Sequence, residues 1–135
     1  MNDVDDDPLA SHGCRTLVRS GTSRVGILFG LAPAYDGLDE AKRMRLERVM
    51  RLWCDGESLT REMYNGNEGR STEGTMLHAF KTFKHRLYGF IRQLDGVRTF
   101  VIVDYDPAKK RDQSDQNVLK RARGRVDAFG KGKAE

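Results

Sequence analysis

An Asp95-Gly96 pair stands between two segments rich in β-forming residues, and it limits the possible folds more than any other part of this sequence. Asp-Gly is typical of a two-residue hairpin turn, because both central positions must adopt positive φ angles. Residues 77–93, before the pair, are rich in aromatic side chains, and residues 98–105, after it, contain the continuous apolar run FVIV. We therefore predict an antiparallel hairpin whose second strand lies centrally in a sheet, with the numbers of paired residues adding up to about 191.

Two further segments have the periodicity of amphipathic helices. Residues 36–56 and 114–129 carry apolar side chains three and four positions apart, so that each segment has one face to bury. Residues 25–31 form a weaker strand candidate, because glycines interrupt the apolar run. The order helix, hairpin, helix predicts a small α+β domain: an antiparallel sheet, an N-terminal helix or helices packed on it, and a short C-terminal helix. The residues that we expect on the buried helix faces are Leu46, Val49, Met50, Trp53, Val118, Leu119, Ala122 and Val126.

The length of 135 residues allows one domain with a substantial core but not two. We predict that residues 25–128 form this domain, that residues 1–24 are a disordered leader, and that residues 129–135 are a flexible tail. Two cysteines, Cys14 and Cys54, are too few to indicate a disulfide framework or a metal site, which suggests a reducing cytoplasm. No apolar segment is long enough for a membrane helix, so we expect no membrane partner.

Positive charge is concentrated in the C-terminal half of the sequence. Residues 78–135 contain fourteen Lys or Arg against seven Asp or Glu, whereas residues 1–40 contain three against seven. The predicted hairpin register places Arg86 opposite Tyr105, so cations of the first strand approach the end of the sheet at which a basic packet follows the second strand. The six cations expected to converge there are Lys81, Lys84, Arg86, Lys109, Lys110 and Arg111.

Such a cluster of like charges favours an anionic partner, because mutual repulsion costs stability until an anion binds. Arg and Lys both suit the oxygens of a phosphodiester backbone, and the nearby Tyr88 and Tyr105 could stack on exposed RNA bases. The alternative is that these cations form a solvated fringe that protects the edges of the sheet. A metal site is less favoured, because Asp104, Asp106 and Asp112 are mixed with Lys and Arg and are better interpreted as ion-paired residues of a turn.

Four ordered motifs resemble the RelE/HigB group of bacterial toxins, part of the RelE/ParE superfamily of type II toxin–antitoxin systems. The motifs are Arg86-Leu87-Tyr88-Gly89-Phe90, Val101-Ile102-Val103, Lys109-Lys110-Arg111 and Leu119-Lys120-Arg121-Ala122. The resemblance covers residues 38–128, about two thirds of the chain. It implies a compact fold in which helices pack on a twisted antiparallel sheet. It also implies an endoribonuclease that cleaves mRNA on the ribosome until a cognate antitoxin, a separate acidic or helix-turn-helix protein, silences it.

The reaction that this resemblance implies needs no metal or cofactor, because the ribose 2′-hydroxyl attacks the adjacent phosphate. Arg86 matches the family's strand arginine and would stabilise the transition-state oxygens, while Lys110 and Arg111 would clamp the phosphate or protonate the leaving oxygen. Lys81 and Lys84 fall where the family often has lysines, and one of them could act as the base. We therefore assign catalysis to Arg86, Lys84, Lys110 and Arg111, and RNA binding to Lys81, Lys109, Tyr88 and Tyr105.

His85 is an alternative base, since an imidazole titrates near neutrality. Strand alternation nevertheless places His85 on the opposite face from Lys84 and Arg86, which favours a packed or surface histidine. Two other functions stay open: a non-catalytic, phage-derived module that binds nucleic acid, and a ParE-like inhibitor of DNA gyrase. A small neighbouring gene for a helix-turn-helix protein would favour a toxin over a binding module.

Overall fold

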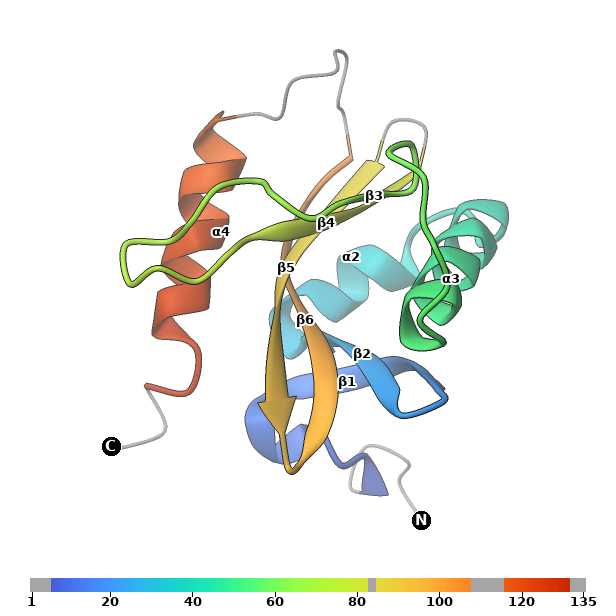
Figure 1. Cartoon of the computed structure of the whole chain (residues 1–135), viewed down its shortest axis with the longest axis horizontal. Helices are drawn as coiled ribbons and strands as arrows, with labels where there is room; N and C mark the ends of the chain where they lie inside the picture. Colours follow the sequence, from blue (N-terminus) through green and yellow to red (C-terminus); the bar gives the residue numbers. More distant parts are fainter. Residues whose placement is uncertain (1–5, 83–84, 108–115, 132–135) are drawn as a thin grey trace.

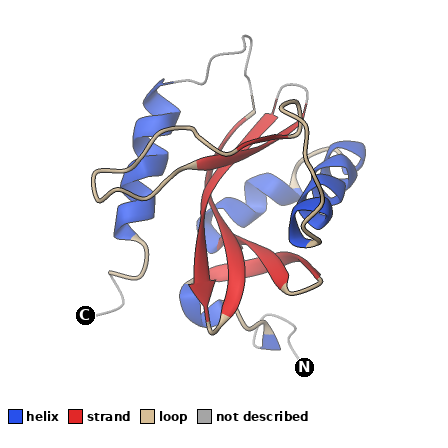
Figure 2. Cartoon of the chain, viewed as in Figure 1, coloured by secondary structure: helices blue, strands red, loops and turns tan. Residues whose placement is uncertain are grey.

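The computed structural model describes residues 6–82, 85–107 and 116–131, and its architecture is α+β (Figure 1). A six-stranded sheet has the order β1-β2-β6-β5-β4-β3, and helices lie on both sides of it (Figure 2). The strands are β1 (Cys14–Ser20), β2 (Ser23–Leu28), β3 (Tyr64–Asn65), β4 (His78–Thr82), β5 (His85–Leu94) and β6 (Val97–Asp106). The helices are the 3-10 helices η1 (Ala10–His12) and η2 (Phe29–Leu31) and the α-helices α2 (Ala32–Asp36), α3 (Glu40–Cys54) and α4 (Gln116–Ala128).

The sheet is mostly antiparallel, as predicted, with one exception. Strand β2 pairs with β6 in parallel, while β1–β2, β3–β4, β4–β5 and β5–β6 are antiparallel pairs. The exception follows from chain order, because α2 and α3 lie between β2 and the later strands and carry the chain back across the sheet. The predicted fold class, with an N-terminal helix on the sheet and a short C-terminal helix, is confirmed.

The expectation that residues 1–24 form a disordered leader is wrong for the described residues 6–24, because they contain η1, β1 and the start of β2. Strand β1 is the edge of the sheet, and the side chain of Leu9 is fully buried against Gly26 of β2. Within β1 only Cys14 and Val18 are buried, and they are four positions apart. Cys14 and Val18 belong to hydrophobic clusters on opposite faces of the sheet, because the strand register shifts between Thr16 and Val18, so the segment lacks the strict alternation of a half-buried strand.

The single strand predicted over residues 77–93 is in fact two strands. Strand β4 ends at Thr82, β5 begins at His85, and the two form an antiparallel hairpin. Both contain aromatic and cationic residues, and no Gly, Pro or Asn marks the change of direction in the sequence. The connecting residues 83–84 lie outside the described ranges.

The prediction that residues 129–135 form a flexible tail is wrong at its first residue, because Phe129 is packed against the core. Phe129 packs edge-on against Phe90 with ring centroids 5.2 Å apart, and it borders the core beneath α4. Residues 132–135 lie outside the described ranges. An aromatic side chain directly after a helix can extend the buried face of that helix, which a composition-based boundary does not reveal.

The Asp95-Gly96 turn has the predicted hairpin geometry, with φ angles of 53° at Asp95 and 77° at Gly96. From this turn as far as the pair Gly89–Ile102, the strands β5 and β6 follow the predicted register. The local sequence signal therefore determined both the turn and the first half of the hairpin.

A β-bulge at Val103 changes the register in the second half of the hairpin. Val103 has no opposite residue in β5, so the pairing shifts by one position beyond it. Arg86 therefore lies opposite Asp106, and the prediction that it faces Tyr105 is wrong. The bulge also reverses which side chains of β6 point to each side, so that Asp104 turns toward α4.

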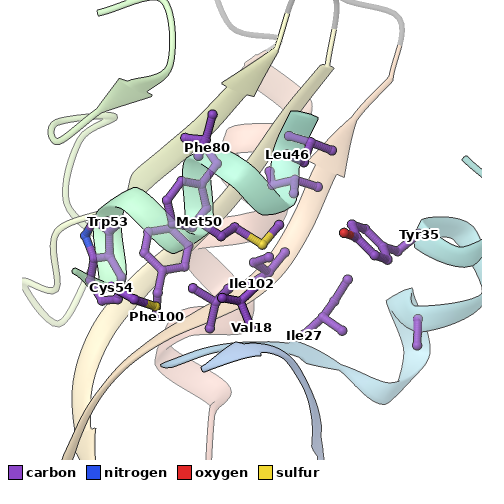
Figure 3. Packing of buried hydrophobic residues seen from close by; sticks show 14 residues of the cluster. Val18, Ile27, Tyr35, Leu46, Met50, Trp53, Cys54, Phe80, Phe100 and Ile102 are labelled. Carbon is purple, nitrogen blue, oxygen red and sulfur yellow. The ribbon is translucent and has the colours of Figure 1, made fainter. Parts of the chain in front are cut away.

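Two hydrophobic clusters lie on opposite faces of the sheet. On the α3 face, Leu46, Met50 and Trp53 of α3 pack over Phe100 and neighbouring residues (Figure 3). The α4 face carries a second cluster, formed by α4, the N-terminal segment and alternate residues of β4, β5 and β6. The residues predicted on the buried helix faces lie in these clusters, although Val118 is only partly buried. No helix among the described residues is long and apolar enough to cross a membrane.

Candidate nucleic-acid interface

A row of charged residues crosses β4, β5 and β6 at the end of the sheet where the chain leaves β6. In the strand register, Lys81 lies opposite Arg86, and Arg86 lies opposite Asp106. Arg86 is two residues before Tyr88, which belongs to the cluster under α4, so this row lies on the α4 face. The structure thus brings Lys81 and Arg86 together, through a hairpin of β4 and β5 that was not predicted from the sequence.

Arg86 is buried in an ion pair that the sequence did not reveal. Its Nη1 donates to Oε2 of Glu68 at 2.9 Å, and the side chains are only 11% and 7% exposed. Glu68 lies in a glycine-dense segment eighteen residues before Arg86, with no local pattern that singles it out. Only the fold brings this carboxylate to the predicted catalytic arginine, and it balances the positive charge there.

Residues 66–77, here called the Glu68 loop, connect β3 to β4 and run across to α4 (Figure 1). Backbone hydrogen bonds close the loop on itself, from Glu68 N to Leu77 O and from Leu77 N to Gly69 O, both at 2.8 Å. Nη2 of Arg123 in α4 also donates to the carbonyl oxygen of Glu68 at 3.0 Å. The position of the Glu68 carboxylate is therefore fixed from two sides.

Asp104 anchors α4 to the sheet beside this row. Its carboxylate is 2% exposed and accepts two hydrogen bonds from Arg121, at 2.5 and 2.8 Å, while Nη1 of Arg125 lies 3.1 Å from Oδ2. Asp104 is thus ion-paired as predicted, but Asp104 and Asp106 lie in strand β6 and not in a turn, and Asp112 lies outside the described residues. Arg121, from the Leu119–Ala122 motif, is here a partner of a buried carboxylate.

The assignment of Tyr88 to RNA stacking is wrong. Its side chain is fully buried in the cluster under α4, so neither ring face is available to a base. Tyr88 is two residues after Arg86 in β5, so both side chains lie on the α4 face, and α4 covers the sheet at Tyr88. Sequence reasoning identified its strand but could not show which positions α4 covers.

Tyr105 is half-buried but lies on the α3 face, away from Arg86. Its ring is parallel to that of His85, with an interplanar angle of 3° and centroids 6.4 Å apart. Burial, together with the nearby Lys42 ammonium, lowers the pKa of His85, and the Asp106 carboxylate opposes this shift. The expectation that His85 is a packed histidine on the opposite face from Arg86 is confirmed.

Four of the predicted site residues, Lys84, Lys109, Lys110 and Arg111, lie outside the described residues. Of the predicted cluster of six cations, the structure therefore places Lys81 and Arg86. Within the described ranges, no group of three or more His, Cys, Asp or Glu side chains is arranged to hold a metal ion. What the described part presents is a strand arginine beside a lysine, balanced by a carboxylate from a loop.

Comparison with known proteins adds no relative to this picture. No family model matches the sequence, and no curated protein and no solved structure matches it at a significant level. The candidate interface is therefore defined by its own residues.

Proposed function

We propose that this protein is a RelE/HigB-like toxin of a type II toxin–antitoxin system, an endoribonuclease that cleaves mRNA on the ribosome in the cytoplasm. Its partners are ribosome-bound mRNA and a cognate antitoxin encoded as a separate chain. The ordered motifs within residues 86–122 support this proposal. The single observation that carries the proposal is the position of Arg86, whose guanidinium extends from the central strand β5 with Lys81 as its neighbour on β4.

The proposed reaction requires positive charge at the phosphate and no redox chemistry. The 2′-oxygen forms a bond to phosphorus while the bond to the 5′-oxygen breaks, and a proton moves from the 2′-hydroxyl to a base as another reaches the leaving oxygen. Arg86 and Lys81 stabilise the phosphate oxygens, which gain negative charge in the transition state. Lys84, Lys110 and Arg111, which lie outside the described residues, keep the roles that the resemblance implies.

Induced expression in a bacterial host tests the proposal. We expect the wild-type protein to arrest growth and to create new 5′-hydroxyl ends inside translated codons, and Arg86→Gln to lose both effects. Removing Arg86 takes a charged partner from the buried Glu68 carboxylate, so the soluble amount of each variant must be matched first. Arg92→Gln is the control, because Arg92 lies on the same strand but stacks on Phe90 at 4.7 Å, away from the row. Normal growth and intact mRNA with wild-type protein would refute the toxin.

One observation favours a second function, a non-catalytic module that binds nucleic acid. Glu68 neutralises part of the charge of Arg86, and a transition state that gains negative charge depends more on uncompensated, preorganised cations than simple RNA binding does. If the protein is such a module, purified wild-type protein binds RNA, Arg86→Gln weakens this binding, and neither protein affects growth. Measuring RNA affinity and growth for the same pair of proteins separates the two functions.

A further inference from the structure

The contact between Arg86 and Glu68 resembles the contact that a phosphate would make. A carboxylate and a phosphate both offer anionic oxygens to a guanidinium at short range. Glu68 Oε2 lies 2.9 Å from Arg86 Nη1, and both side chains are withdrawn from solvent. An incoming phosphate cannot reach Arg86 at this distance unless the carboxylate moves away.

The covering carboxylate belongs to a loop, whereas the arginine belongs to a central strand. Arg86 lies in β5, which is hydrogen-bonded to β4 on one side and to β6 on the other. Glu68 is held by the turn between Glu68 and Leu77 and by the hydrogen bond from Arg123 to its carbonyl oxygen. The loop also contacts α4 and the residues after it through Glu73, which meets Asp127 and Lys131, but all of these contacts can break while the strand stays intact, so the loop is the part that can open.

We infer that Glu68 is an intramolecular substitute for phosphate that keeps the site closed, and that RNA binds by exchanging its own phosphate for this carboxylate. The inference rests on the proposed function only in taking Arg86 as the phosphate ligand. While no RNA is bound, the carboxylate keeps negative charge beside Arg86 and its neighbour Lys81, and an incoming phosphate can replace that charge. It also makes the site respond to anything that moves the Glu68 loop.

Binding of a non-cleavable RNA, with 2′-deoxyribose at every position of potential attack, tests the exchange apart from catalysis. We expect Glu68→Gln to bind this RNA about tenfold more tightly than wild type. The affinity of the variant should also fall more steeply as the salt concentration rises, by the slope that about one additional phosphate contact adds. Glu73→Gln is the matched control, because it removes an equal charge from the same loop but from an exposed pair with Lys131. It should bind like wild type. The double variant Glu68→Gln/Arg86→Gln should lose the gain.

A second variant guards against instability of Glu68→Gln, which removes a buried carboxylate partner of Arg86. Gly69 has a φ of +94°, which strains any residue with a side chain, and an added Cβ would lie 2.5 Å from Nη2 of Arg123, which donates to the Glu68 carbonyl oxygen. Gly69→Ala should therefore strain the loop and push Arg123 away from it without changing any charge. It should also bind RNA more tightly, by a few fold.

Two results would overturn the inference: no gain in affinity in either folded variant, or a gain that persists in the double variant. The outcome in cells is independent of this test. If growth and mRNA stay intact while Glu68→Gln still tightens binding through Arg86, the toxin is refuted and the exchange stands. If cleavage depends on Arg86 but Glu68→Gln and Gly69→Ala bind no more tightly, the exchange is refuted and the toxin stands.

Discussion

Among the described glycines, Gly89 leaves the least room for a side chain. A methyl group there would overlap the carbonyl oxygen of Val101 and come within 2.5 Å of Phe100 Cε1, whereas Gly124 in α4 has open space at the same position. We predict that Gly89→Ala lowers the free energy of unfolding by about 3 kcal/mol. Gly124→Ala should raise it by roughly 0.5–1 kcal/mol. Urea unfolding followed by circular dichroism measures both, and equal stabilities would contradict the close approach of β5 and β6.

Asp7 gives a pH dependence at the same scale. Burial raises the pKa of its carboxyl, but hydrogen bonds from the hydroxyl and backbone N–H of Thr16 and from Leu9 N–H outweigh it and hold the pKa below the ordinary 3.8. The folded state therefore favours the carboxylate, and this stabilisation is complete near neutral pH and is lost as the pH falls through the lowered pKa.

We predict that Asp7→Asn is less stable than wild type at neutral pH, and that the difference shrinks below about pH 4. Urea unfolding of both proteins across this range measures it. A difference that stays constant into strong acid would mean that the charge of Asp7 does not matter for stability.

Among the structural elements, the N-terminal segment belongs to the core. Leu9 is fully buried between the sheet and α4, whereas Met44 on α3 is 64% exposed. We predict that Leu9→Ala lowers the free energy of unfolding by about 2–4 kcal/mol, because a cavity remains in the second cluster. Met44→Ala, the matched control, should change it by less than about 0.5 kcal/mol. Chemical denaturation decides, and a Leu9→Ala protein as stable as the control would make the segment dispensable.

The same scale shows which elements can be predicted from sequence. The helix around Leu46 and Trp53 and the turn at Asp95-Gly96 depend on local periodicity and backbone preference, and both were predicted. The break after Thr82 and the bulge at Val103 have no such local signal, because pairing between strands produces them. Predictions that depended on them, such as the partner of Arg86, failed for this reason.

At the scale of the whole molecule, long-range contacts limited the prediction of the site. Lys81 lies opposite Arg86 because the chain turns back after Thr82, and the single strand predicted over residues 77–93 did not include this turn. The neutralising Glu68, and the burial of Tyr88 under α4, depend on a loop and a helix whose positions no local pattern encodes. The sequence therefore predicted the charged strands of the interface but not the elements that cover them.

Because one sheet carries both hydrophobic clusters, we expect the molecule to unfold as a single cooperative unit. Substitution of the two arginines that bind Asp104 tests this expectation. Arg121 and Arg125 are 53% and 41% exposed, so losing either one leaves Asp104 a partner and should cost less than about 1 kcal/mol. The double variant Arg121→Gln/Arg125→Gln leaves a carboxylate that is 2% exposed without either arginine, and should cost about 3 kcal/mol, more than the two single losses together.

Trp53, the single tryptophan, lies on the α3 face and reports whether this damage crosses the sheet. Strands β5 and β6 contribute to both clusters, since Leu87 and Phe100 lie on the α3 face and Phe90 and Val101 on the α4 face. In the double variant we therefore expect the urea midpoint of Trp53 fluorescence to fall together with that of far-UV circular dichroism. A fluorescence midpoint that stays at the wild-type value while the dichroism midpoint falls would mean that α4 unfolds separately, so that the helix covering the candidate interface could open without loss of the α3 core.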